Sequence, residues 1–313
     1  MGEVIVRHVA VQDALEIHAS FPGCTVQAAR WGVGICALNV LINSTVCCSQ
    51  FNCLEFPHPN TTPEEGITDY ASDPTQGPAC AIACAAGALY RNYFVEVDSS
   101  GQQGQRADRQ INNLIELEDW LNNARNKFWL IRNGYSFSSE EALLRLNEVL
   151  SEVDISEAAS KVRVGVHRNV GVVYEKRNNE VESQAILCTQ VYCSALSCAY
   201  SGISNKKLWE PLATIVLKAA YEATLWAAIL TSLTEDTVSA SRTYSLYKDH
   251  VFLTAIGGGV FGNEQYWIED AIVDAVQTIR CSGLGAKLTV SIAHYKKINA
   301  EYAERINRRL GIQ

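Results

Sequence analysis

The amino-acid sequence predicts an α/β fold, in which short apolar strands alternate with helices. A β-branched strand at Val251–Thr254 leads through a glycine turn directly into a helical stretch at Tyr266–Ile279. An apolar stretch around Ala220 has the length and density of a long buried helix. Lys161–His167 and Ala185–Tyr192 have the composition of buried strands, and a charged, hairpin-like stretch separates them.

The remaining elements follow from the same patterns. Strands are expected at Glu3–Val6, Leu89–Val97, Phe128–Asn133 and Ala286–His294. Helices are expected at Pro78–Ala86, Ile111–Asn123 and Glu140–Val153. Val46–Glu55 is either a helix end or a strand that leads into a turn-rich loop. Since no repeat or low-complexity linker interrupts the chain, we expect one domain over residues 1–313, with the middle third decorating one side.

Charge and hydropathy exclude several classes of protein. The formal net charge of −8 argues against a nucleic-acid partner, but backbone N–H groups can still hold a small anion. Pro211–Leu233 is long enough to span a membrane, but Lys218 and Glu222 lie in its middle, so a buried core helix with a Lys218–Glu222 pair is expected. The first residues lack a signal peptide, and no basic cluster addresses the chain to the nucleus. We therefore predict an intracellular, cytoplasmic protein with no membrane partner.

The chain has 11 cysteines, an odd and high number. Their spacings do not match the paired C-x₂₋₄-C arrangement of zinc sites. Without a secretion signal, reduced thiols that pack as small apolar residues are the expected state. We predict no disulfide, no metal site and no cofactor.

The first candidate site is the glycine turn after the strand at Val251–Thr254. It consists of Gly257, Gly258, Gly259, Val260, Phe261, Gly262 and Asn263. A strand, a glycine loop and a helix in this order present backbone N–H groups to an anion at the carboxyl edge of a sheet. The spacing is neither the dinucleotide fingerprint nor a P-loop, and a purely structural turn is the alternative.

The second candidate site is a carboxylate-rich loop that follows Asn52. Glu64, Glu65, Asp69 and Asp73 fall within ten residues, and Thr75-Gln76-Gly77-Pro78 then opens a helix of small residues. Asp73 and Thr75 also suit a helix N-cap, so a capping role is the structural alternative.

Taken together, the two sites resemble a macrodomain of the poly(ADP-ribose) glycohydrolase-like branch. The stretches that carry this resemblance are SQFNCLEF, TPEEG, TQGPACAIA, YRNYF, NGY, QVYCSAL, AYEATLWAA and LTAIGGGVFGN, between about residues 45 and 280. They are most similar to the MavL-like family of arginine-specific ADP-ribosylhydrolases, which includes a member that acts on ADP-ribosylated ubiquitin. The resemblance implies one three-layer α/β/α macrodomain-like domain with a mixed sheet, helical decorations, and N-terminal and central insertions.

The resemblance also implies a hydrolase that removes ADP-ribose from a modified protein, through an arginine linkage, with ubiquitin as a possible carrier. Asp69 and Asp73, with Glu65 in reserve, are expected to hold the guanidinium and activate water. ADP-ribose is expected to contact Asn52, Thr75, Gln76 and the glycine loop, with the Phe261 ring against the ribose and the loop N–H groups on the diphosphate.

The chain departs from its relatives at three places. The glycine triplet and Glu pair of the chain-cleaving glycohydrolases are absent from its catalytic loop. Arg168-Asn169 stands where an acidic residue is expected, and Ser197 stands where proline looks usual.

Two other functions remain open. A reader module would bind ADP-ribose without needing the carboxylates, and a different hydrolase would use those carboxylates to hold a divalent cation.

Overall fold

The computed structural model describes residues 4–10, 41–45, 85–171, 187–234, 250–283, 288–294 and 297–312. Their largest sheet has the strand order β1-β8-β7-β2-β6-β5. Its strands are β1 (Val4–Ala10), β2 (Leu41–Thr45), β5 (Gly165–Gly171), β6 (Leu187–Cys193), β7 (His250–Leu253) and β8 (Leu288–His294). All neighbouring strands pair in parallel except β5, which runs antiparallel to β6 at one edge. The sheet is therefore mixed, and the α/β fold class that the sequence predicts is confirmed.

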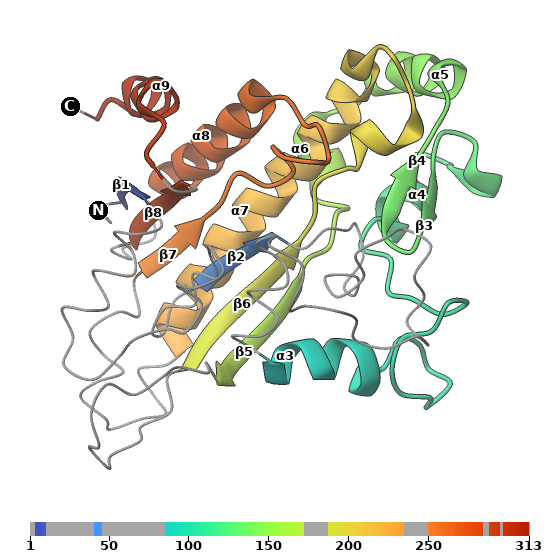
Figure 1. The fold of residues 1–313 in the computed structure, drawn as a ribbon, viewed down its shortest axis with the longest axis horizontal. Helices are drawn as coiled ribbons and strands as arrows, with labels where there is room; N and C mark the ends of the chain where they lie inside the picture. The colour runs from blue at the N-terminus through green and yellow to red at the C-terminus, as the bar shows by residue number, and fades with distance from the viewer. Residues whose placement is uncertain are drawn as a thin grey trace.

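One face of the sheet is covered by α7 (Glu210–Thr234) and α8 (Gln265–Cys281) (Figure 1). Side chains alternate across a strand, and on β6 Val191 and Cys193 point into this layer, where the Cys193 thiol lies 3.9 Å from the Thr224 hydroxyl. The helix α9 (Ala300–Leu310) packs beside α8. This layer contains most of the apolar core of the described residues.

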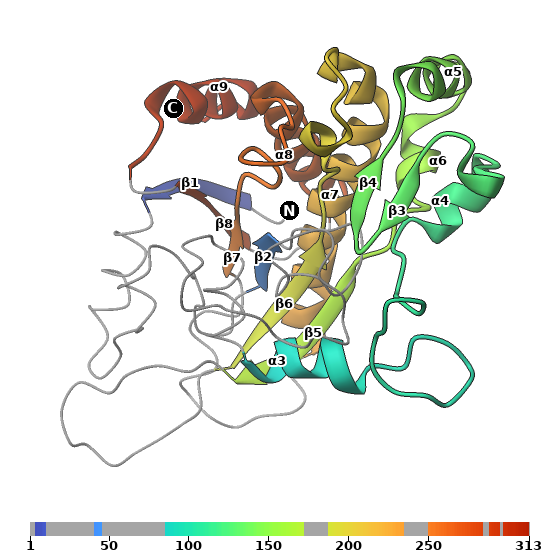
Figure 2. The same cartoon turned by 45° about the vertical axis from the view of Figure 1, so that its right-hand side comes forward.

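The opposite face carries α3 (Ala85–Leu89) and the π-helical turn η5 (Tyr90–Phe94), which lie against β5 and β6 (Figures 1 and 2). At Gly87 an added Cβ would lie 2.9 Å from Gln190 Oε1 and 3.0 Å from the Tyr192 hydroxyl. The small residues of α3 thus allow the helix backbone to approach polar side chains of β6 closely. Helices on both faces of the sheet make the described part a layered α/β structure.

A group of short elements lies beside α7, beyond the end of β6 (Figure 2). It comprises α4 (Ile115–Trp120), η6 (Ala124–Asn126), β3 (Leu130–Arg132), β4 (Tyr135–Phe137), α5 (Glu140–Leu150), α6 (Ile155–Ala159), η7 (Cys198–Ser201) and η8 (Lys206–Trp209). Two of its helices start at capping side chains, since Ser139 accepts from Ala142 N and Asp154 accepts from Glu157 N. Asn133 and Gly134 both have positive φ, which is the two-residue turn that a tight hairpin requires.

The apolar helix α7 is a core helix, as predicted. Lys206–Thr231 has the length and hydropathy of a membrane span, but 67% of the apolar 18-residue stretch within it is buried inside the fold. Lys218 does not pair with Glu222, as we expected from the sequence, but lies 3.9 Å from Asp274 on α8. Glu222 instead accepts a hydrogen bond from the Trp226 indole at 3.4 Å. Lys218 contacts Asp274 rather than Glu222 because α8 lies directly against α7.

The prediction of a strand at Leu89–Val97 was wrong over most of its length, because Tyr90–Phe94 forms the π-helical turn. Its alternating aromatic and polar residues imitate a strand, but Arg91 and Asn92 are consecutive and both buried. The Gln105 side chain donates to Arg91 O and its backbone N–H donates to Asn92 O, so a distant loop satisfies carbonyls of the widened turn.

Other predicted elements differ from the structure in their boundaries, are missing from the prediction, or lie outside the described residues. The strand expected at Lys161–His167 begins only at Gly165, because Arg163 N donates to Asn113 O, in a distant loop, instead of pairing with a strand. The strand β2 and the helix α9 were not predicted. The elements expected at Val46–Glu55 and over most of Pro78–Ala86 lie outside the described residues.

Candidate functional site

The candidate site lies at the edge of the sheet where the parallel strands β2, β6 and β7 all end. Loops that leave the carboxyl ends of adjacent parallel strands converge there, which is where α/β folds bind ligands. The loop after β7 runs through the glycine segment into α8, and the loop after β6 runs into η7. The loop after β2 lies outside the described residues.

The glycine loop has a compact backbone that requires glycine at two positions. Gly257 and Gly262 have φ of +72° and +70°, which side chains rarely adopt. At Gly257 an added Cβ would also lie 2.3 Å from the Ala195 Cβ, so no side chain fits. Asn263 N donates to Gly257 O at 3.0 Å and closes the loop at its base. The first and last glycines of the loop are therefore structural requirements.

The middle of the loop presents unused hydrogen-bond donors. In the part of the chain that the structure describes, the backbone N–H groups of Gly259, Val260 and Phe261 donate to no protein acceptor. Gly258, Gly259 and Val260 are exposed, and an added Cβ on Gly259 would have no neighbour within 4 Å. Consecutive backbone donors at a strand–helix junction are the arrangement that binds phosphate oxygens.

Asn263 connects the glycine loop to the loop after β6. Its side-chain amide donates to Leu196 O at 2.7 Å and to Gly257 O at 3.3 Å. The side chain is 4% exposed, and among the described residues its Oδ1 has no partner. Its amide nitrogen is thus engaged by the protein, and the predicted ligand contact of Asn263 stays a prediction.

Phe261 is buried rather than open to solvent. Its ring is 5% exposed and lies edge-on to Tyr135 and Tyr200, with centroids 6.0 and 5.6 Å away. Tyr135 and Tyr200 stack on each other at 5.2 Å, and Phe261 O accepts from Ala199 N. The contacts described give Phe261 an anchoring role. Its predicted contact with a ribose is not tested by them.

A buried phenol fixes the start of the glycine loop. The Tyr221 hydroxyl, on α7, donates to Thr254 O at 2.6 Å and accepts from Ile256 N at 3.0 Å. Burial raises the pKa of Tyr221 well above its ordinary value, so the phenol stays neutral and keeps both bonds. We did not assign Tyr221 a role from the sequence, because a tyrosine in an apolar helix has the pattern of a core residue.

The hairpin β3–β4 is joined to the same edge by two serines. Ser136 N donates to Ser197 Oγ at 2.8 Å and Ser197 N donates to Ser136 Oγ at 2.9 Å. Both side chains are buried. Proline, which the resemblance led us to expect at position 197, could not form this pair because it has no N–H to donate.

A second polar cluster lies on the face of the sheet covered by η5. The Arg91 guanidinium is fully buried and lies 4.1 Å from the Tyr192 ring, whose hydroxyl donates to Gln190 Oε1. His167 contacts the rings of Tyr90 and Tyr192 edge-on. Burial, and then the charge of Arg91, lower the pKa of His167 to about 4, so this imidazole is neutral at physiological pH.

The catalytic half of the predicted site lies outside the described residues. This applies to all the carboxylates and to the polar residues expected beside them: Asn52, Glu65, Asp69, Asp73, Thr75 and Gln76. Their roles stay predictions. Arg168 and Asn169 lie at an irregularity in the pairing of β5 with β6.

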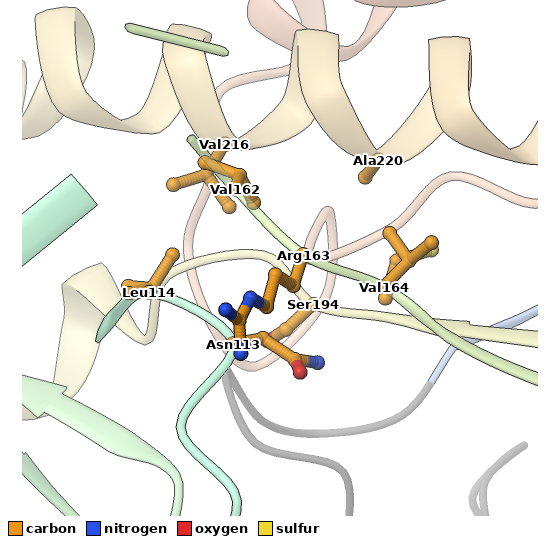
Figure 3. Close-up of a pocket in the computed structure, with 9 residues that line it drawn as sticks. Asn113, Leu114, Val162, Arg163, Val164, Ser194, Val216 and Ala220 are labelled. Atoms are coloured by element: carbon orange, nitrogen blue, oxygen red, sulfur yellow. The ribbon is translucent and has the colours of Figure 1, made fainter. Parts of the chain in front are cut away.

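The described residues contain a small cavity but no metal-binding cluster. A small cavity lies between α7 and the segment before β5, with Val162 near Val216 and with Asn113, Arg163 and Ser194 together nearby (Figure 3). It has room for about one water molecule, far less than a nucleotide needs. Within the described ranges, no three His, Cys, Asp or Glu side chains are grouped as a metal site. Cys188, Cys193 and Cys198 are buried.

A scan against models of protein families and a search of curated proteins both found no match to this chain.

Proposed function

We propose that the chain is a macrodomain-type ADP-ribosylhydrolase, which binds ADP-ribose and cleaves it from a modified protein. The observation that carries this proposal is the glycine loop between β7 and α8. Its three consecutive unused N–H groups, at Gly259, Val260 and Phe261, lie at the carboxyl edge of a parallel sheet. Such a loop suits a diphosphate, and it needs no positive net charge from the chain.

The packing of the family-like motifs supports the same function. NGY supplies Tyr135, which contacts the glycine loop at Phe261. QVYCSAL supplies Leu196, whose carbonyl accepts from the Asn263 side chain. AYEATLWAA supplies Tyr221, which holds the first residues of the loop. Motifs that are far apart in the sequence thus meet around a single loop, as expected of motifs that share one site.

The reaction requires cleavage of the bond between the anomeric carbon of ribose and an arginine nitrogen. Water attacks the anomeric carbon, the C–N bond breaks, and the guanidine leaves with a proton, so free ADP-ribose and arginine are produced. The glycine loop would hold the diphosphate and fix the ribose relative to the water. Asp69 and Asp73, with Glu65 as the alternative, would orient the water and the cationic leaving group.

The proposal is tested by release of ADP-ribose from an arginine-ADP-ribosylated protein in EDTA. Asp73→Ala removes a predicted catalytic carboxylate. Gly259→Glu places a negative charge in the loop, and Gly259→Gln is its control of equal size, because the position is open in both cases. We expect wild-type release that Asp73→Ala and Gly259→Glu abolish and Gly259→Gln largely retains.

Two other outcomes would identify the alternative functions. ADP-ribose binding that Gly259→Glu weakens, without any release of ADP-ribose, would make the protein a reader. Release that EDTA abolishes would indicate a hydrolase that uses a divalent cation. If the wild type neither binds nor releases ADP-ribose, the macrodomain proposal is wrong.

A further inference from the structure

We propose that Lys206 supplies the cationic side chain for the anion held on the glycine loop, and so makes this site selective for ligands that carry phosphate. The inference rests on the proposed function for the identity of the natural ligand, ADP-ribose. The claim that a negatively charged phosphate binds here rests on the position of Lys206 alone.

Lys206 lies against the end of the glycine loop. It is the first residue of η8 and is exposed, and its Nζ lies 3.2 Å from the point where a Cβ on Gly262 would be. The same point is 3.1 Å from the Ala199 Cβ, so any side chain at residue 262 would displace the ammonium group or the η7 turn. Because residue 262 is a glycine, the Lys206 side chain has space beside the backbone of the loop. Gly262 directly follows the three residues with unused N–H groups.

The charge of Lys206 is not neutralised by a neighbouring side chain. Within the described residues, no carboxylate oxygen lies within 4.0 Å of its Nζ, whereas Lys218, Arg163 and Arg305 all have an acidic partner. Burial raises the pKa of the Cys198 thiol to about 12, and the charge of Lys206 lowers it while that of Glu264 raises it, so both charged groups lie near this thiol. The cation is thus close to the loop and available to a ligand.

An ammonium group and three backbone donors together match the chemistry of a diphosphate. The backbone N–H groups supply directional hydrogen bonds, and the lysine supplies a full positive charge on a flexible stem. This charge matters because the chain carries a net charge of −8, which repels an anion at long range. A neutral nucleoside would gain nothing from Lys206.

The test compares Lys206→Gln with Lys207→Gln, a matched control, because both lysines are exposed neighbours on η8. Titration calorimetry at low salt measures the Kd of each protein for inorganic pyrophosphate, ADP-ribose and adenosine, and a melting curve checks that each variant folds. We expect Lys206→Gln to weaken pyrophosphate and ADP-ribose about five- to tenfold, through loss of one charge-assisted contact. Lys207→Gln should change both by less than about twofold, and adenosine affinity should be the same in all three proteins.

Each outcome supports or overturns the inference. Equal affinities of the two variants for pyrophosphate and ADP-ribose would overturn it while leaving the proposed function intact. Pyrophosphate binding that depends on Lys206, in a protein that does not bind ADP-ribose, would support the inference and reject the proposed function. A wild-type protein that binds neither ligand would overturn both.

Discussion

Side chains join two neighbouring parts of the molecule to the rest of the fold. One part is the glycine loop at the start of α8, and the other is the helix α9, which packs along α8. The side chains that hold these two parts differ in charge. The loop is held by a neutral phenol, Tyr221, and a neutral amide, Asn263. The helix α9 is held by an ion pair, in which Arg305 makes a bidentate contact with the buried Glu269, and by two histidines. The first set does not titrate in acid, whereas the second set includes two histidines whose pKa values are lower in the folded protein than their ordinary value of 6.5.

The histidines form a chain that only neutral rings can make. Asn299 N donates to His294 Nδ1, the His294 Nε2 lies 3.0 Å from His8 Nδ1, and the His8 Nε2 lies 3.0 Å from Asn307 Oδ1. Since the Asn307 oxygen accepts, His8 must carry its proton on Nε2, and His294 must then donate from Nε2. A second proton on either ring would place two N–H groups against each other.

The side chains that hold the candidate site therefore respond differently to acid from those that hold the periphery. Acid should loosen α9 before it affects the glycine loop, because protonation breaks the histidine chain but leaves the Tyr221 bonds unchanged. The four predictions below test this difference, from the largest expected effect to the smallest.

Gly257→Ala should cause the largest loss. The added methyl would overlap the Ala195 Cβ, and alanine disfavours the φ of +72°, so we expect the free energy of unfolding to fall by about 3 kcal/mol or more. Urea unfolding measures this loss. Gly259→Ala is the control, since its Cβ meets nothing within 4 Å, and it should cost less than about 1 kcal/mol. Similar losses at both positions would show that the loop backbone is not constrained as described.

Tyr221→Phe should cost about 2 kcal/mol, because it removes two hydrogen bonds of a buried phenol, one donated to Thr254 O and one accepted from Ile256 N. The backbone bond from Ile256 N to Thr254 O remains in the variant and limits the loss. Tyr302→Phe is the matched control on α9. The Tyr302 ring is also buried, but its hydroxyl has no hydrogen-bond partner among the described residues, so its removal should be neutral or slightly stabilising. If the two variants lose equal stability, the phenol of Tyr221 does not fix the loop.

The sequence predicted the elements whose signals are local. The strand at His250–Leu253, the glycine loop and the helix Gln265–Cys281 follow one another, and each was located to within a residue or two. The burial of α7 also followed from its continuous apolar composition. The α9 helix carried a signal that we did not use, since Tyr302, Ile306 and Leu310 recur at the spacing of one helical face and all are buried.

The interactions that complete the candidate site were not predictable in the same way. Tyr221 and Ile256 are 35 residues apart, and Ser136 and Ser197 are 61 apart. No local pattern pairs them, because their contact exists only once α7 and the hairpin have packed against the sheet edge. Lys206 was missed for the same reason, since a lysine in a polar loop looks solvated until the fold brings it beside Gly262.

Acidification should destabilise α9 more than the glycine loop. Burial lowers the pKa of His294 to about 4, and burial also lowers the pKa of His8. Between the ordinary histidine value of 6.5 and about 4, the unfolded chain binds more protons than the native one, so stability falls as the pH falls through this range. After allowance for solvent screening we expect a loss of about 1–2 kcal/mol. Hydrogen exchange at pH 7 and pH 5 measures it locally.

The expected pattern is faster exchange of the α9 amides at pH 5, after correction for the intrinsic rate, with no change in α8 near the glycine loop. His294→Gln should flatten the pH dependence of stability over this window, although the variant itself is less stable. A wild-type protein with equal protection of α9 at both pH values would contradict the histidine chain and the contrast drawn from it.

Ser136 and Ser197 should show the smallest effect, and one that depends on both residues. Each serine accepts a backbone N–H of the other, so Ser197→Ala removes the acceptor of Ser136 N and should cost about 1 kcal/mol. Ser136→Ala should cost a similar amount for the reciprocal reason. The double variant should cost less than the sum, by an interaction energy of about 0.5–1 kcal/mol, because either single change already breaks the reciprocal pair. Urea unfolding of the four proteins measures this energy, and strictly additive losses would mean that the hairpin is held to the site by other contacts. Because the hydroxyls stay neutral, the same energy should be found at pH 7 and pH 5, unlike the stability that the histidine chain gives to α9.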